Sequence, residues 1–398
     1  MLKRVLIVST LFAHFVSVAV MGQNPCGSAT TSKLYCLMPT AFHTPATEFS
    51  FFNTAFATDV SQLPLATPAS GFIFSIDPST GLPTASSASF GPIMTERSET
   101  IGRHKVFVGF TYQRFTFNRI DGNDLKNVPI VFKFPTSGDV VYTPTNNRIN
   151  STVNQYVAYA TFGLTNRVDV SIAVPFERIS LGVSSTGTEY STTTNAQQSF
   201  QEFVPGSASG FGDVILAAKG TAWYGERMAL ALGAELRLPS GDALNFLGSG
   251  AVGIKPYVAL SGKGRVSPHL NLGYQWNGNS VLARNSAGDQ QLPGYFLYYL
   301  GADIGASKRL TVIADFLGQE FFNAQRVTLP IMQTIPNRGL SFPGVEMKTG
   351  SYSSDNLALG LKVNPWANIL ITGNVLCRLN NGGLRSNVVP LVGISYTH

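Results

Sequence analysis

The sequence predicts an all-β protein, a closed antiparallel transmembrane β-barrel of about 12 strands, which follows an N-terminal segment of a different pattern. Three observations predict this class. Charged residues make up only 13% of the 398 residues, whereas apolar residues make up 44% and glycine fills 39 positions. From residue 105 onward, apolar side chains alternate with small or polar ones. The connections between the alternating segments are short and long in turn.

Residues 1–22 have the features of a secretory signal peptide. Lys3 and Arg4 precede an apolar stretch from Val5 to Val20, and small residues near its end, at Ala19 or Gly22, offer alternative sites of cleavage. No later segment has the run of about 18 apolar residues that a membrane-spanning helix needs. We therefore expect an exported protein without a helical anchor.

The cysteines fit an oxidising compartment. Cys26 and Cys36 are close enough in sequence to close a small loop by a disulfide, and Cys377 then remains unpaired. The histidines that follow the signal peptide are too scattered to suggest a zinc site; they are His43, His104, His269 and His398. We expect no metal and no other cofactor.

Residues 23–104 do not follow the strand rhythm and are expected to form an N-terminal extension. Apolar residues at helical spacing predict one short amphipathic helix before Pro64; they are Phe49, Phe52, Phe56, Val60 and Leu63. Two placements stay open, one packed against the periplasmic rim of the barrel or a partner, the other inside the barrel as a plug. The turn at 77–81 further suggests a small hairpin.

Residues 105–398 are expected to form the barrel. The alternation is clearest at 228–239, where Leu232 belongs to the apolar, outward set and Ala231 to the small, inward set. On this basis Leu232→Arg should destabilise the barrel, and Ala231→Arg should be milder. The pattern predicts twelve strands, at 105–119, 151–163, 168–182, 211–222, 228–239, 251–263, 267–278, 294–305, 309–322, 351–363, 368–380 and 385–397.

The connections sort by length. Short turns are expected at 164–167, 223–227, 264–266, 306–308 and 364–367, and long loops at 120–150, 183–210, 240–250, 279–293 and 323–350. The last connection, 381–384, is short but should lie on the long-loop side. Short turns at one rim and long loops at the other are typical of a bacterial outer-membrane barrel, and closure is required because lipid cannot hydrogen-bond a sheet edge. We expect outer-membrane lipid as a partner and insertion by the barrel assembly machinery.

Charges of both signs are expected on the inward faces, at Asp169, Glu177, Asp213, Lys219, Glu235, Arg237, Lys255, Asp303, Asp315 and Arg378. They could form a selective polar lumen, or they could pair across neighbouring strands and simply fill the barrel. Inward glycines, among them Gly109, Gly233 and Gly301, are expected to leave space for a narrow bore.

One motif is misleading. Residues 248–253 match a dinucleotide-binding pattern, but Pro256 and an alternating run follow them where that pattern needs a helix. We interpret the glycines as a turn that enters a strand. With a net charge of only +6 and no basic run, nucleic acid is not an expected partner.

Four short motifs carry a family resemblance: residues 210–213 (GFGD), 238–242 (LPSGD), 248–250 (GSG) and 271–274 (NLGY). The barrel resembles outer-membrane, transporter-like proteins of the meta-pathway of phenol degradation family. This resemblance implies a porin-like channel, not an enzyme, for passive uptake or efflux of small solutes, with aromatic or hydrophobic compounds as the expected class.

Two alternatives to a channel remain open. The first is a non-transporting barrel with an occluded lumen, which displays its loops at the surface or has a structural role. The second and less favoured is a lipid hydrolase. A hydrolase needs a histidine beside a serine on the outer belt, and the predicted register turns His269 inward.

Overall fold

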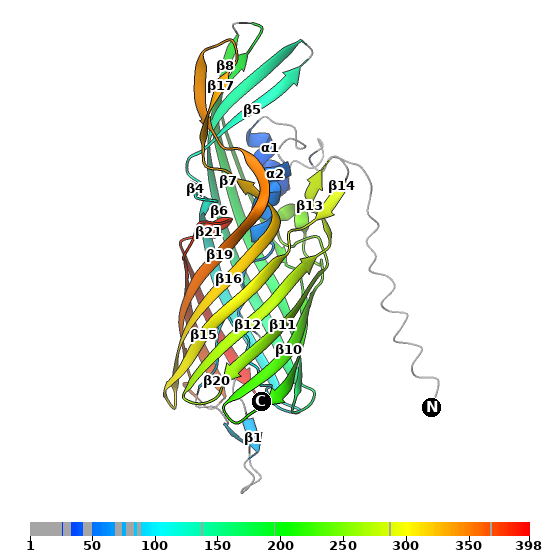
Figure 1. Cartoon of the computed structure of the whole chain (residues 1–398), viewed down its shortest axis with the longest axis vertical. Coiled ribbons are helices and arrows are strands. Elements are labelled where there is room, and N and C mark those ends of the chain that lie inside the picture. The colour runs from blue at the N-terminus through cyan, green and yellow to red at the C-terminus, as the bar shows by residue number, and fades with distance from the viewer. Residues whose placement is uncertain are drawn as a thin grey trace, which may run out of the picture.

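The computed structural model describes residues 26, 33–42, 50–67, 74–76, 83–85, 89–136, 138–194, 196–285, 288–366 and 368–398. The predicted signal peptide at 1–22, His43 and the helix candidate Phe49 lie outside these residues. The described chain is one β-barrel that holds an N-terminal segment in its interior (Figure 1).

Twelve antiparallel strands close the barrel, as the sequence predicts. Each strand pairs with two neighbours, and the ring closes because β3 pairs with both β22 and β6. In ring order the strands are β3 (Val106–Ile120), β6 (Asp139–Gly163), β7 (Val168–Ser191), β9 (Ile215–Tyr224), β10 (Met228–Arg237), β11 (Gly253–Gly262), β12 (Val266–Asn277), β15 (Tyr295–Ser307), β16 (Leu310–Val327), β19 (Met347–Val363), β20 (Ile369–Arg378) and β22 (Val388–Thr397).

The connections separate by length, as predicted. Tight turns join β6 to β7, β9 to β10, β11 to β12, β15 to β16 and β19 to β20 at one end of the barrel, which we call the short-turn end. The opposite end, the long-hairpin end, rises well above the barrel (Figure 1). Its additional elements are β4 (Asn123–Asp124), β5 (Val128–Thr136), β8 (Gln197–Phe211), η2 (Ala243–Asn245), β13 (Asn279–Asn285), β14 (Gly288–Gln291), β17 (Ile331–Ile335), β18 (Leu340–Gly344) and β21 (Leu384–Ser386).

The segments predicted as long loops are largely strands, which corrects the sequence interpretation. β5 pairs with the first part of β6, and β8 pairs with the second part of β7 along its whole length. Along β8, exposed residues alternate with partly buried ones, and Val204 and Ala208 on the partly buried face pack against the core. The exposed face is largely polar, with Ser199, Gln201, Ser207 and Ser209, so β8 lacks the apolar outer face that marks a lipid-facing strand. Serine and threonine in these hairpins are compatible with a solvated sheet. The 248–253 motif, by contrast, leads into β11 as expected.

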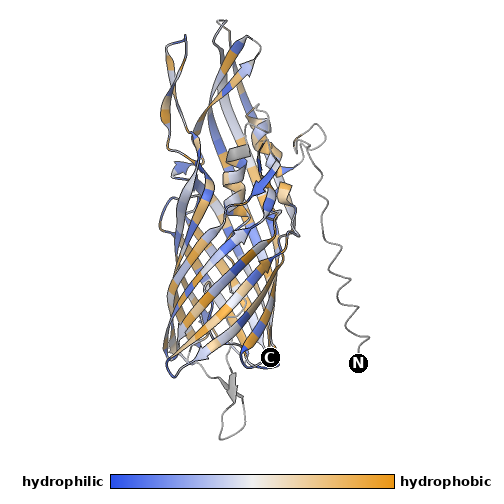
Figure 2. Cartoon of the chain, turned by 45° about the vertical axis from the view of Figure 1, so that its right-hand side comes forward, coloured by the Kyte–Doolittle hydropathy of each residue, from blue (hydrophilic) through white to orange (hydrophobic). Residues whose placement is uncertain are grey.

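An apolar belt surrounds the barrel. Its strands carry many hydrophobic residues (Figure 2), and the outward positions expose large apolar side chains such as Val108, Leu216, Leu300 and Val392. Exposed aromatic residues such as Trp223 mark the short-turn edge of the belt. This arrangement is that of a lipid-facing barrel with aromatic girdles. No helix in the described part of the chain is long and apolar enough to cross a membrane.

The predicted faces of β10 agree with the structure. The Leu232 side chain is 54% exposed on the outer surface, whereas Ala231 is fully buried and packs with Tyr257 and Ala259. The space that an arginine at position 231 would need is therefore filled, so the inward position does not offer the mild substitution that the sequence suggested.

Leu232→Arg should destabilise the barrel in lipid by about 2–4 kcal/mol, because it places a charge in the apolar belt. Urea unfolding of the protein in lipid vesicles measures this change. Phe203→Arg is the matched control, since Phe203 is 62% exposed on β8, beyond the belt. Equal losses of stability for both variants would contradict the position of the belt.

The N-terminal segment lies inside the barrel. η1 (Leu34–Cys36), α1 (Leu37–Ala41) and α2 (Ser50–Val60) occupy the long-hairpin end, where α2 contacts β13 and β16 (Figure 1). β1 (Phe74–Ile76) pairs with β2 (Pro83–Ala85), as the expected hairpin, and β1 lies beyond the short-turn end. Residues 89–101 are buried almost throughout. The chain thus spans the whole length of the lumen.

The helix α2 is buried on all sides and is not simply amphipathic. Phe52, Phe56 and Val60 are buried, but so are Asn53 and Thr54. These polar side chains are hydrogen-bonded, Asn53 Nδ2 to the Tyr35 carbonyl at 2.8 Å and Thr54 Oγ1 to the Leu282 carbonyl at 2.8 Å. A helix inside a barrel has no solvent face, so its polar residues bond to the wall and to neighbouring segments.

Candidate functional site

Aromatic packing and a hydrogen bond from Arg237 hold α2 in the long-hairpin half of the lumen. The Phe56 ring packs edge-on against Phe246 and Phe117, with centroids 5.3 and 6.3 Å apart. Just after the helix, the Ser61 carbonyl accepts a hydrogen bond from Arg237 at 3.2 Å. The helix is therefore fixed both by buried apolar area and by a charged residue of the wall.

Asp59 is a second polar anchor of α2. Its carboxylate accepts hydrogen bonds from the Tyr352 hydroxyl at 2.9 Å and from the Leu384 backbone N–H at 2.7 Å. Burial raises the pKa of the Asp59 carboxyl to about 7, because desolvation outweighs these two hydrogen bonds.

Residues 89–101 fill the short-turn half of the lumen and are bonded to the wall at several levels. Lys362 Nζ donates to the Pro92 carbonyl at 2.6 Å, and Lys219 Nζ donates to the Arg97 carbonyl at 2.7 Å. Asp169 accepts from the Ile101 N–H at 3.0 Å. Inward charges of the barrel therefore serve in part to bind the backbone of the N-terminal segment.

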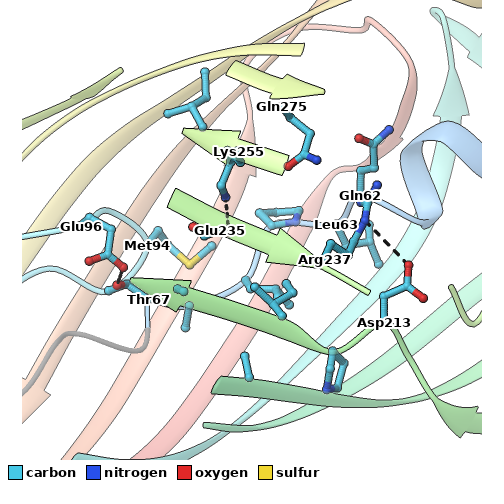
Figure 3. Close-up of a pocket in the computed structure, with 18 of the residues that line it drawn as sticks. Gln62, Leu63, Thr67, Met94, Glu96, Asp213, Glu235, Arg237, Lys255 and Gln275 are labelled. Carbon is cyan, nitrogen blue, oxygen red and sulfur yellow. Dashed lines mark hydrogen bonds and ion pairs between the residues drawn. The ribbon is translucent and has the colours of Figure 1, made fainter. Parts of the chain in front are cut away.

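A cavity of about 150 Å³ remains between these two fillings, at mid-lumen. Residues 60–67 form one side, Met94 and Glu96 form another, and the barrel wall forms the rest (Figure 3). A hydrogen bond between Thr67 and Glu96 joins the two N-terminal stretches beside it. Its apolar lining includes Leu63, Leu65, Met94, Ile215, Ala217, Leu297 and Leu317, and its aromatic lining Tyr257, Tyr295 and Tyr299.

Three cations and five carboxyl groups line the cavity, and each cation lies beside a carboxylate. Lys255 contacts Glu235 at 2.7 Å and Lys219 contacts Glu96 at 3.2 Å, and in Figure 3 Lys255 and Glu235 point toward each other. The two further carboxyl groups of the lining, Asp169 and Glu177, accept hydrogen bonds from Ile101 and, at 2.7 Å, from Gln155. The lining is therefore polar, and each of its cations is already beside a carboxylate.

Asp213 organises the wall at the long-hairpin edge of the cavity. It accepts hydrogen bonds from the Gly241 N–H at 3.1 Å and from the N–H and hydroxyl of Ser249, with the N–H at 2.7 Å. Arg237 Nε lies 3.7 Å from it, and Figure 3 shows this ion pair. Three of the motifs that carry the family resemblance thus meet at one carboxylate. A side chain at position 248 would collide with Asp213, which explains the glycine there.

Seven of the ten predicted inward charges line this one cavity: Asp169, Glu177, Asp213, Lys219, Glu235, Arg237 and Lys255. Asp303 and Asp315 lie elsewhere, on either side of His269, whose nitrogens are 3.3 Å from Asp303 and 2.7 Å from Asp315. Arg378 is separate from both groups, half-buried at the end of β20, and hydrogen-bonds Asn381.

The inward glycines do not leave open space, contrary to the sequence interpretation. The ring of Tyr257 covers Gly233, and the ring of Tyr159 covers Gly109. Gly301 is covered by Asp315 and His269. Glycine at these positions accommodates a large side chain from the neighbouring strand, so the small residues permit packing of the lumen.

Sequence reasoning missed the contribution of the N-terminal segment to the cavity. Gln62, Thr67, Met94 and Glu96 all line it, but they lie in irregular chain whose pattern has no period. The disulfide between Cys26 and Cys36 is present. In the described part of the chain Cys377 is the free cysteine.

A closed barrel with a lipid-facing apolar belt and a solute-sized cavity in its lumen defines a bacterial outer-membrane β-barrel protein. Residues 132–311 match the family described as "Putative MetA-pathway of phenol degradation", which confirms the resemblance seen in the motifs. The matched range runs from β5 to the start of β16 and includes Asp213 and much of the cavity wall. No curated protein matches the chain.

Several solved structures are similar to this chain at low sequence identity. An outer-membrane channel from Pseudomonas putida F1 is 14% identical, with a TM-score of 0.48, over 76% of this chain and 99% of that one. A FadL homologue from Pseudomonas aeruginosa is 9% identical, with a TM-score of 0.32, over 83% and 96%. The toluene transporter TodX of P. putida is 8% identical, with a TM-score of 0.31, over 74% and 89%.

Proposed function

We propose that the protein is an outer-membrane channel for passive movement of small, neutral or weakly polar solutes, with monoaromatic compounds as the expected class. The cavity at mid-lumen is the observation that carries this proposal. An apolar cavity of about 150 Å³ is known to hold a benzene molecule. The mid-lumen cavity of this protein has the same volume, about 150 Å³. The phenol-degradation description of the matched family agrees with an aromatic solute.

The lining of the cavity suits a phenol-like molecule. Leu63, Leu297 and the tyrosine rings can contact an aromatic face, while the paired charges and Gln275 offer hydrogen-bond partners to a hydroxyl. A bulky anion would have to break an existing ion pair such as Lys255–Glu235 to gain a counter-charge. Small neutral solutes are therefore favoured over anions.

The N-terminal segment is the proposed gate of this channel. α2 fills the lumen on the long-hairpin side of the cavity and residues 89–101 fill it on the other side, so the structure corresponds to a closed state. A twelve-stranded barrel leaves a narrow bore, which a single helix and an extended chain can close. We further propose that the barrel assembly machinery inserts the protein, with the long-hairpin end facing outward.

The non-transporting barrel is the second candidate, because both halves of the lumen are filled. It predicts that the cavity binds no solute and that no condition opens the bore. The lipid-hydrolase alternative is not favoured, since His269 lies inside the lumen between two carboxylates.

Calorimetric titration of phenol into the full mature chain in detergent tests the proposal. Binding should be lost in Ala217→Trp, because Ala217 lines the cavity and the indole would occupy it. Ala218→Trp is the matched control, since the adjacent residue is exposed on the outer surface, and it should bind phenol normally. If the unchanged protein binds no phenol and neither conducts ions nor passes small aromatics in a planar bilayer, the non-transporting barrel becomes the better conclusion.

A further inference from the structure

The outer surface formed by β3, β6, β7 and β8 changes from aromatic to polar at one level. Tyr112, Tyr156, Phe176 and Phe211 are paired in register across the four strands. Their ring centroids are 5.0, 6.4 and 5.7 Å apart in that order. Continuous aromatic rows on the outside of a barrel mark the boundary between the hydrocarbon and the headgroups of the membrane. We call this set the aromatic row.

Two arginines, Arg114 and Arg178, occupy the next outward positions beyond the aromatic row, toward the long-hairpin end. Arg114 pairs with Asn154, Asn154 with Arg178, and Arg178 with Ser209. Both arginines are exposed. Since neighbouring strands are about 4.8 Å apart, their Cα atoms are about 10 Å apart, and two long side chains can converge on one group from that separation. The Tyr112 hydroxyl donates to Asn154 Oδ1 at 2.9 Å and so orients the amide between them.

The next row upward is made of hydroxyl groups, at Thr116, Thr152, Ser180 and Ser207. None of the outward residues in these three rows is acidic. A groove of about 640 Å³ crosses this surface, lined by Phe110, Tyr156, Phe176, Arg178, Ser207 and Ser209 among others. It therefore combines an aromatic floor, a guanidinium and hydroxyl donors.

We propose that this surface binds the phosphate groups of lipopolysaccharide in the outer leaflet of the outer membrane. The aromatic row places Arg114 and Arg178 at the depth of the lipid headgroups, and long hairpins of such barrels face outward. Guanidinium groups bind phosphate in bidentate fashion, and the hydroxyl row supplies further donors to the sugar and phosphate oxygens. The aromatic groove below accommodates the start of an acyl chain. The positive charge of this surface is complementary to the phosphate groups of the lipid. The neutral solute proposed for the cavity has no charge that this surface would match.

Lipopolysaccharide binding to the full mature chain in detergent tests the proposal. Radiolabelled lipopolysaccharide, with and without chemical removal of its phosphate groups, is titrated in the presence of a chelator of divalent cations, and the bound fraction is separated by gel filtration. The double variant Arg114→Gln/Arg178→Gln should bind the phosphorylated form about tenfold more weakly than the unchanged chain, because it loses two charge-assisted contacts. The dephosphorylated form should bind both proteins equally weakly.

Arg148→Gln is the matched control. Arg148 is also an exposed, outward arginine of β6. It lies three outward positions beyond Asn154 toward the long-hairpin end, away from the aromatic row, so its loss should leave the affinity for lipopolysaccharide unchanged. An equal loss for Arg148→Gln would show non-specific charge attraction and overturn the proposal. Unchanged affinity of the double variant, or displacement of the lipid by inorganic phosphate at equal concentration, would overturn it as well. Both arginines are at the surface, and heat-dependent gel mobility confirms that each variant is folded.

Discussion

Removal of residues 23–101 is expected to raise the single-channel conductance of the barrel several-fold. The variant would keep the signal peptide and begin the mature chain at Gly102, so that both segments that fill the lumen, α2 with the elements before it and residues 89–101, are absent. The barrel wall remains complete, because the twelve ring strands start at Val106. Both halves of the lumen would then fill with water, and planar-bilayer recordings would show the change.

Opening the disulfide is the control for this experiment. Cys26→Ser/Cys36→Ser removes the cross-link but leaves the buried contacts of α2 with Phe246, Phe117 and Leu282 in place. We expect its conductance to stay low. If the shortened chain folds, as judged by heat-dependent gel mobility, and conducts no more than the full chain, the N-terminal segment does not close the lumen.

The barrel strands could be predicted because lipid and lumen demand different side chains at alternate positions. In β10 the lipid-facing Leu230 and Leu232 alternate with the inward Ala231 and Gly233, and the pattern stands out in the sequence. The hairpins beyond the belt could not be predicted in this way. The outer face of β8 is exposed and lies beyond the belt, so this face is not required to be apolar, and its serines suggested a loop.

The inward charges of the site could be predicted from the same alternation, but their partners only in part. Glu235 and Lys255 are directly opposite each other on β10 and β11, so a hairpin register would place them together. Glu96 and the carbonyl of Arg97, the partners of Lys219, lie in a segment without any periodic pattern. Because irregular chain is ordered only by its contacts with the wall, no local signal identifies it.

The barrel wall and the N-terminal segment contribute differently to the packing of the lumen. The wall provides charges at regular inward positions, and the N-terminal segment provides carbonyl groups and a few side chains that satisfy them. Inward glycines such as Gly233 and Gly109 admit tyrosine rings and do not open a bore. The remaining cavity exists where neither α2 nor residues 89–101 reach, and its lining is shared by the wall and the chain inside it.

Asp213→Ala is expected to lower the free energy of unfolding by about 3–5 kcal/mol, because removal of one partner leaves a buried arginine without its counter-charge. Arg237 is buried, and the Gly241 and Ser249 N–H groups would lose their acceptor as well. Urea unfolding in lipid vesicles measures the loss. Asp242→Ala is the matched control, since Asp242 pairs with Lys33 near the surface, where an ion pair contributes about 1 kcal/mol or less.

The double variant Asp213→Ala/Arg237→Met separates the charge from the hydrogen bonds. If the unpaired guanidinium is the main cost, the double variant should recover a substantial part of the stability, because an apolar side chain of similar length can replace a buried ion pair. Recovery should be incomplete, since the two backbone N–H groups remain without an acceptor. Arg237 also donates to the Ser61 carbonyl, so the same variant should also loosen the end of α2. A loss for Asp213→Ala no larger than that for Asp242→Ala would contradict the central role of this carboxylate.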